Sequence, residues 1–157
     1  MFTKEECELI LEFTNQTEGL TSNPYYKDSM YYVWYIKRNE ETEWIFQKLF
    51  KFLKEDARVK VHRELDMLFL QSVKEGNQFE KHTDKSNYFN VGVCLNDNYE
   101  GGELYVENSD YTIIKKQGSI YFFEGHKPHG INKVLSGQRY AIVGFFEQGD
   151  LTFNKLM

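Results

Sequence analysis

The feature that most constrains this chain is a succession of short β-forming segments that fills the sequence after residue 60. These segments are rich in β-branched and aromatic residues, and Gly, Asn and Asp, which favour turns, separate them. No stretch with helical spacing interrupts the series, so the strands should pair antiparallel in a sandwich, a barrel or a jelly roll. We expect strands at residues 67–74, 88–95, 103–107, 111–114, 118–123, 130–135 and 139–147.

The first 60 residues carry mainly helical signals. A Thr-x-x-Glu capping box begins at Thr3, and the apolar positions after it predict a helix over residues 4–14. A second helix should follow Asn39, where apolar residues recur at helical spacing in EETEWIFQKLFKFLKED. Between these helices, residues 30–36 have the residue types of a strand. The two helices should therefore support one face of a sheet.

Length and composition limit the class of protein. A chain of 157 residues can bury one core, so we expect one domain, with helical support from 1–60 and a β core from 61–148. The N-terminus lacks a basic start and an apolar stretch, and no apolar run approaches membrane-spanning length. We therefore expect a cytoplasmic protein without a membrane partner. Cys7 and Cys94 lack the spacing of a zinc site and should be buried free thiols.

Two histidines and one carboxylate form a candidate metal site. His82 and Asp84 are two residues apart, so both side chains leave the same face of an extended strand. The pair alone is weak evidence, but His129, in a turn that leads into a late strand, would complete the set. Two histidines, one carboxylate and open coordination positions are typical of non-haem iron(II) oxygenases. His126 lies in the same turn as His129 and is the competing ligand.

Arg139 begins the apolar segment RYAIVGFF, ten residues after His129. Its head group would be desolvated in the interior, where a planar guanidinium usually needs a carboxylate partner. The distal carboxylate of 2-oxoglutarate would supply such a partner. An ordinary surface or ion-paired arginine is the alternative, and the spacing from His129 favours the co-substrate.

Four segments of the chain occur in the order found in one enzyme family: GNQFEKHTD, CLNDNYEGGELYV, KKQGSIYFFEGHKPHGINKV and SGQRYAIVGFF. Over about residues 67–147 the chain resembles the prolyl 4-hydroxylase-like iron(II)/2-oxoglutarate-dependent dioxygenases. The resemblance implies a mainly β fold with flanking helices and a double-stranded β-helix core, also called jelly-roll or cupin-like. It also implies Fe(II) as cofactor, 2-oxoglutarate and O₂ as co-substrates, and ascorbate as a further cofactor.

The same resemblance assigns site residues. It places the metal on His82, Asp84 and His129 and the co-substrate on Arg139, and it makes His126 a loop residue or a partner of a ligand. Many members carry, at the position of Asn90, a Thr that touches the co-substrate. Members also often carry a Tyr about nine residues before the first His, but this chain has Val73 there, so Tyr88 is the candidate to replace that hydrogen bond.

The resemblance makes a prolyl residue in a peptide or protein the leading substrate. A free amino acid or another small molecule is the alternative within the same chemistry. A nucleic-acid demethylase is disfavoured, because such relatives usually carry a second Arg where this chain has Phe145, and because the net charge is −5. A non-catalytic cupin-like binding module is the alternative outside enzymes. The aromatic residues would line a peptide groove or belong to the core: Tyr25, Tyr26, Tyr31, Tyr32, Trp34 and Tyr35.

Overall fold

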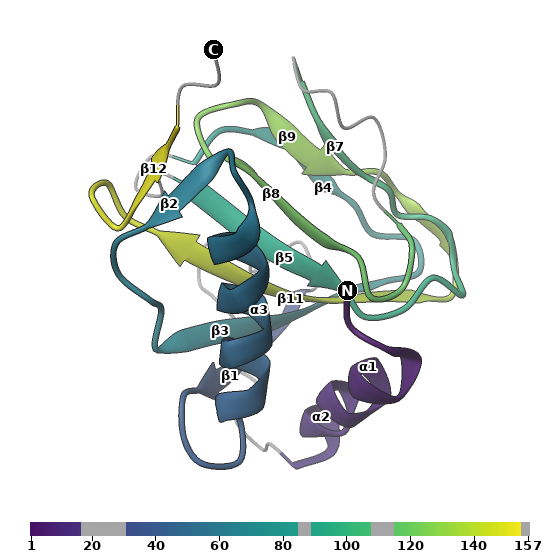
Figure 1. Cartoon of the computed structure of the whole chain (residues 1–157). Coiled ribbons are helices and arrows are strands. Elements are labelled where there is room, and N and C mark those ends of the chain that lie inside the picture. Colours follow the sequence, from purple (N-terminus) through teal and green to yellow (C-terminus); the bar gives the residue numbers. More distant parts are fainter. Residues whose placement is uncertain (17–30, 85–88, 108–114, 155–157) are drawn as a thin grey trace.

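A five-stranded antiparallel sheet, the major sheet, organises the fold (Figure 1). The computed structural model describes residues 1–16, 31–84, 89–107 and 115–154. The major sheet has the spatial order β1-β3-β11-β5-β8, so strands distant in sequence lie side by side. Its strands are β1 (Tyr31–Lys37), β3 (Met67–Lys74), β11 (Gln138–Phe146), β5 (Phe89–Cys94) and β8 (Ile120–Glu124).

Shorter strands form three smaller sheets. The three-stranded sheet has the order β4-β9-β7, with β4 at Phe79–His82, β9 at His129–Ile131 and β7 at Leu104–Val106. Two further pairs complete the described β structure: β10 (Val134–Ser136) with β6 (Glu100–Gly101), and β12 (Leu151–Phe153) with β2 (Val59–Val61). The observed architecture confirms the expected mainly β class with antiparallel pairing.

One face of the major sheet, the inner face, packs toward the three-stranded sheet. Because side chains alternate along a strand, the register places Phe123, Asn90 and Phe145 beside one another on this face, and Tyr121, Gly92 and Val143 in the next row. A buried cluster joins the two sheets, with Tyr121 and Phe123 of β8 packed with Leu104 and Ile131 of the smaller sheet. The inner face therefore forms one wall of the space between the sheets.

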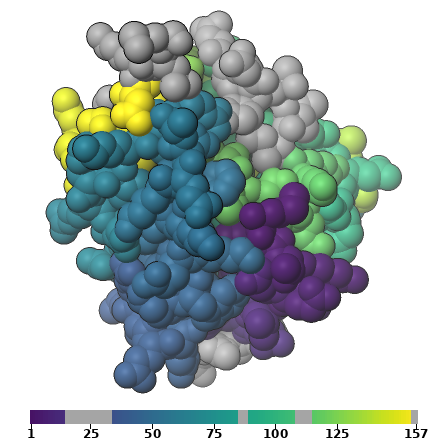
Figure 2. Space-filling model, viewed as in Figure 1, coloured from purple at the N-terminus to yellow at the C-terminus, as the bar shows by residue number. Residues whose placement is uncertain are grey.

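Helices cover the opposite, outer face of the major sheet. The apolar stripe of α3 (Glu43–Glu55) is fully buried, and each such side chain contributes about 1.5–3 kcal/mol of burial free energy. The capping box is present at the start of α1 (Lys4–Leu11), where the Thr3 hydroxyl accepts from the Glu6 amide at 3.1 Å. Figure 2 shows α3 in blue and the N-terminal helices in purple over this face.

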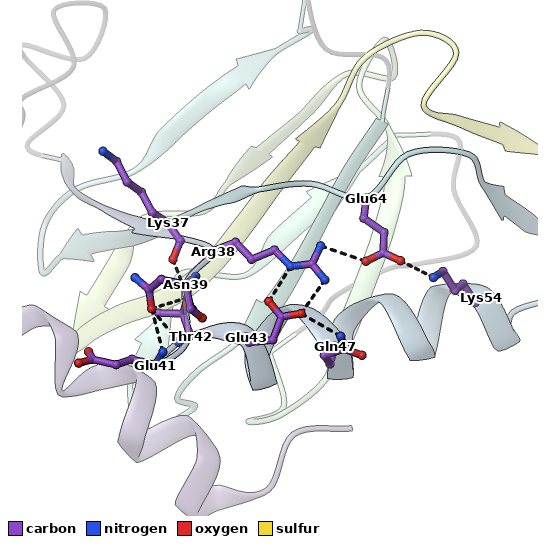
Figure 3. Close-up of polar contacts among 9 residues, drawn as sticks. All are labelled: Lys37, Arg38, Asn39, Glu41, Thr42, Glu43, Gln47, Lys54 and Glu64. Carbon is purple, nitrogen blue, oxygen red and sulfur yellow. Dashed lines mark hydrogen bonds and ion pairs between the residues drawn. The ribbon is translucent and has the colours of Figure 1, made fainter.

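Arg38 joins three separate segments of the helical face (Figure 3). Its guanidinium donates two 2.8 Å hydrogen bonds to Glu43 at the start of α3 and lies 3.0 Å from Glu64, before β3. Lys54, near the end of α3, pairs with the same Glu64. The guanidinium of Arg38 also lies over the rings of Phe46 and Phe50. This network, the Arg38 network, fixes α3 against the end of β1.

Two elements that were expected to be continuous are each divided in two. The helix expected over residues 4–14 ends at Leu11, and a separate α2 (Phe13–Gln16) follows, because the Thr14 hydroxyl donates to the Leu11 carbonyl and competes with helical bonding. The strand expected over 130–135 is two strands, β9 and β10, that belong to different sheets. The chain passes from one sheet to the other at Asn132, whose backbone amide donates to the Glu103 backbone carbonyl.

Four short strands lie outside the expected β segments: β2, β4, β6 and β12. The strand expected at 111–114 lies outside the described residues. Cys7 and Cys94 are buried thiols that form no disulfide among the described residues, as expected. Among the residues that the structure describes, no helix has the length and apolar character needed to cross a membrane.

Candidate metal centre and co-substrate pocket

The three predicted metal ligands meet in space at one end of the three-stranded sheet. His82 is the last residue of β4 and pairs in register with His129, the first residue of β9. Asp84 follows β4, and its amide donates to the Gly125 carbonyl at 2.9 Å, which turns the carboxylate toward both rings. One potential ligand atom from each residue lies within 4.8 Å of the other two. The arrangement can therefore hold one cation.

The hydrogen bonds of the two imidazoles select the tautomer that a metal requires. His82 Nδ1 lies 2.8 Å from the Glu80 carbonyl oxygen, and His129 Nδ1 lies 2.7 Å from the Lys127 carbonyl oxygen. A carbonyl can only accept, so Nδ1 carries the proton in each neutral ring and Nε2 presents a lone pair. Both Nε2 atoms face Asp84, each 3.4 Å from a different carboxylate oxygen. Orientation of metal-binding histidines through their second nitrogen is a general feature of such sites.

Asp84 is held ionised. Its partial burial acts to raise its pKa, but the contacts with His129 and His82 and the hydrogen bond from Asn90 outweigh burial and hold the pKa well below its ordinary value. For His82, burial acts to lower the pKa, and the contacts with Asp84 and the Glu80 carbonyl raise it overall. The centre thus combines an anionic oxygen donor with two imidazole nitrogens, a donor set that suits Fe(II).

Aromatic rings pack against both imidazoles. The ring centroid of Phe79 lies 4.2 Å from that of His82, and the centroid of Phe123 lies 4.7 Å from that of His129. His129 is 5% exposed, and Ile131 is buried beside it on β9. The metal centre therefore opens on a largely apolar cavity.

Arg139 is buried on β11 and lines the same cavity as the three ligands. Its Nη1 donates to Gln71 Oε1 at 3.3 Å, while its Nε and Nη2 have no hydrogen-bond partner among the described residues. No described carboxylate pairs with this guanidinium, although an uncompensated buried charge costs several kcal/mol. Two orphaned donors on one planar group fit a carboxylate that enters the cavity.

The remaining predicted residues have different surroundings. Asn90 lines the cavity, but its Nδ2 donates to Asp84 Oδ2 at 2.6 Å. His126 is largely exposed and lies 3.3 Å from Glu124, away from the three ligands. Val73 is buried opposite Arg139 in the β3–β11 register, and Tyr88 lies outside the described residues.

Of the aromatic residues expected to line a groove or to belong to the core, the structure describes the side chains of Trp34 and Tyr35. Trp34 is buried in the core under the helices, whereas Tyr35 is 46% exposed. Tyr25 and Tyr26 lie outside the described residues, as do the side chains of Tyr31 and Tyr32.

Among the polar side chains that line the cavity, the sequence analysis did not identify Gln71 and Tyr121. Gln71 lies two residues before Val73, so alternation along the expected strand 67–74 could have placed it on the same face. Tyr121 offered no such signal, because its approach to the cavity depends on the order of strands in the major sheet.

Comparison with known proteins agrees with this geometry. The family model of the 2OG-Fe(II) oxygenase superfamily matches residues 67–147, which include all three ligands and Arg139. A PKHD-type hydroxylase of Prochlorococcus marinus (strain AS9601) is 36% identical over 61 residues. That match covers 38% of this chain and 28% of the relative, so the chain spans well under two thirds of that protein.

Two solved structures share the fold. The viral collagen prolyl hydroxylase of Paramecium Bursaria Chlorella virus-1 has a TM-score of 0.68 at 17% identity, covering 92% of this chain and 89% of that chain. A prolyl-4-hydroxylase of Pseudomonas putida also has a TM-score of 0.68, at 13% identity, covering 93% and 88%. These likenesses confirm the expected double-stranded β-helix. With the family match over more than half of its length, the chain belongs to the 2OG-Fe(II) oxygenase superfamily.

Proposed function

We propose that this chain is one catalytic domain that uses Fe(II), 2-oxoglutarate and O₂ to hydroxylate an aliphatic C–H bond, and that its substrate is a prolyl residue in a peptide or protein. One observation carries the catalytic part of the proposal. The three ligand residues and the orphaned donors of Arg139 line a single cavity. A dicarboxylic co-substrate that chelates a metal requires both a cation site and a second site for its distal carboxylate in the same cavity.

Six residues of the cavity have defined tasks in this proposal. His82, Asp84 and His129 would hold the iron on one side, and positions on the other side would stay open to co-substrate and oxygen. Arg139 would bind the distal carboxylate and so orient the 2-oxo acid toward the metal. Iron with bound 2-oxoglutarate supplies the oxidising power for hydroxylation when O₂ is present. The rings of Phe79 and Phe123 exclude water from the reacting atoms.

The substrate part rests on relatives. Two solved structures of the same fold are prolyl hydroxylases by name, and both align with more than nine tenths of this chain. A free amino acid or another small molecule would use the same chemistry and is the alternative substrate class.

Nucleic-acid demethylation has less support. Phe145 lines the cavity at the position where such relatives usually carry a second Arg, and its ring packs on Phe69 at 5.6 Å. An apolar ring there has neither the charge nor the hydrogen-bond donors of that Arg, and the net charge of −5 opposes binding to a phosphate backbone.

Mass spectrometry of a peptide library after turnover tests the proposal. The library should contain prolyl peptides and matched peptides in which alanine replaces proline, each incubated with iron(II), 2-oxoglutarate and O₂. We expect the addition of one oxygen atom to prolyl peptides, with one succinate formed for each hydroxylation. Oxygen addition to free amino acids alone would move the substrate to the small-molecule class. If no succinate forms under any of these conditions, the catalytic proposal is rejected.

A further inference from the structure

Tyr121 reaches across a neighbouring strand into the co-substrate pocket. It lies on β8, and its register partner on β5 is Gly92. A Cβ atom built on Gly92 would lie 2.2 Å from the Tyr121 hydroxyl oxygen and 2.3 Å from the ring carbon that bears it. The phenol therefore lies flat over the backbone of Gly92, in space that a side chain at this position would fill.

This placement brings the phenol to Arg139. Tyr121 is 4% exposed, lines the cavity with Arg139 and Gln71, and interacts with the guanidinium group. Burial raises the pKa of Tyr121, so its hydroxyl is protonated at neutral pH and can donate a hydrogen bond. Its ring stacks with that of Phe123, at an interplanar angle of 12°, which restricts its orientation.

The pocket around Arg139 contains more donors than acceptors. Gln71 Oε1 accepts from Arg139 Nη1, so the donor group of this amide is Nε2. Arg139 Nε and Nη2 have no partner among the described residues. The position from which family members often supply a tyrosine hydroxyl is Val73 here, and Val73 is buried and apolar.

We propose that Tyr121 is a co-substrate-binding residue, whose hydroxyl donates to the distal carboxylate of 2-oxoglutarate beside Arg139 and replaces the hydroxyl that Val73 cannot supply. The inference rests on the proposed use of 2-oxoglutarate. A carboxylate offers about four lone-pair sites, and Arg139, Gln71 and Tyr121 together present enough donors to fill them. Gly92 is required for this arrangement, because any side chain there would displace the phenol.

Tyr121→Phe is the direct test, because it keeps the ring over Gly92 and removes only the hydroxyl. Binding should be measured by calorimetry under anaerobic conditions with iron(II) present, so that no turnover contributes. We expect the dissociation constant for 2-oxoglutarate to rise about tenfold or more, as for loss of a hydrogen bond to a charged group. Iron affinity and the thermal unfolding midpoint should stay close to those of the wild type.

A matched ligand and a matched residue serve as controls. 2-Oxopentanoate has the same carbon chain without the distal carboxylate, so its weaker binding should not change in Tyr121→Phe. Tyr99→Phe removes another buried hydroxyl that interacts with Arg139, but among the described residues Tyr99 does not line the cavity. This variant should leave the affinity for 2-oxoglutarate within about twofold of the wild type.

The outcomes separate this inference from the proposed function. Wild-type protein that does not bind 2-oxoglutarate would reject both. If the wild type binds and Tyr121→Phe binds equally well, the hydroxyl has no part in recognition and the inference is wrong. The inference is also wrong if Tyr121→Phe weakens the binding of 2-oxopentanoate by the same factor, because Tyr121 would then act through packing. Gly92→Ala should reproduce the selective loss of affinity for 2-oxoglutarate, and unchanged affinity in that variant would likewise contradict the inference.

Discussion

Asn90 donates a 2.6 Å hydrogen bond to Oδ2 of Asp84, the same oxygen that lies 3.4 Å from Nε2 of His129. Asn90 is buried on β5, whereas Asp84 lies beyond the end of β4, so this bond ties the carboxylate to the major sheet. The other amide atom, Oδ1, is buried without a partner among the described residues. Asn90 is therefore placed to orient Asp84, a candidate metal ligand.

Asn90→Ala should weaken iron(II) binding about 10- to 100-fold, as for loss of a residue that orients a metal ligand. Anaerobic titration of the apo-protein with iron(II) measures this. At saturating iron, the affinity for 2-oxoglutarate should change much less. The reverse pattern, intact iron affinity with weakened co-substrate binding, would instead support the direct contact with 2-oxoglutarate that the family resemblance suggests.

Removal of any one of the three ligands should abolish iron-dependent turnover. His82→Ala, Asp84→Ala and His129→Ala each leave two ligands. Loss of the third ligand lowers the affinity for iron and disturbs the coordination geometry. His126→Ala is the matched control, because this imidazole is exposed and lies near Glu124, away from the ligands. Succinate formation measures all four variants. Loss of activity in His126→Ala with retention in His129→Ala would show that His126, and not His129, binds the metal.

Arg139→Ala should raise the apparent KM for 2-oxoglutarate about tenfold to hundredfold. A charge-assisted hydrogen bond of this kind contributes about 1.5–3 kcal/mol, and iron affinity should change little. The apparent KM of Arg139→Lys should lie between those of the wild type and Arg139→Ala, because lysine keeps the charge but lacks the planar guanidinium. Succinate formation at varied 2-oxoglutarate concentration measures the effect. Unchanged co-substrate dependence in folded Arg139→Ala would remove this residue from the site.

The Arg38 network should make stability depend on pH in the acid range. Hydrogen bonds from Arg38 and Gln47 lower the pKa of Glu43 from 4.5 to about 2. Because the folded-state pKa lies below the unfolded value, this contribution is fully present above about pH 4.5 and is lost as the pH falls toward 2. Urea unfolding midpoints of the wild type should therefore fall over this window, and those of Glu43→Gln should fall less.

Glu41→Gln is the control for this experiment, since Glu41 lies in the adjacent turn and its carboxylate does not contact Arg38 (Figure 3). It should retain the acid-dependent loss of the wild type. An identical pH dependence in the wild type and Glu43→Gln would show that this ion pair does not contribute measurably to stability, as is common for exposed pairs.

The main strands could be predicted from sequence because their residues favour strands in themselves. The strand expected at 67–74 matches β3, and that at 139–147 is β11 within one residue at each end. The missed β4 has the sequence FEKH, which carries little β signal and is a strand through its pairing with β9. Among the described strands, β2 and β12 pair with each other, and each has three residues.

The candidate metal site was more predictable than the pocket around it. His82, Asp84 and His129 are residue types with a chemistry of their own, so spacing and family resemblance were sufficient to bring them together. The roles of Tyr121 and Asn90 depend on which strands lie side by side in the major sheet, and local sequence does not contain that order. The bond from Asn90 to Asp84 also depends on the path of the chain after β4.

The central claim is that one cavity binds iron(II) and 2-oxoglutarate together. Anaerobic absorption spectroscopy tests it most directly, because a 2-oxo acid that chelates iron(II) gives a band in the visible region. We predict that wild-type protein with iron(II) develops this band as 2-oxoglutarate is added, that it saturates at one co-substrate per chain, and that Asp84→Ala lacks it. Absence of a 2-oxoglutarate-dependent band in folded, iron-loaded wild-type protein would contradict the account.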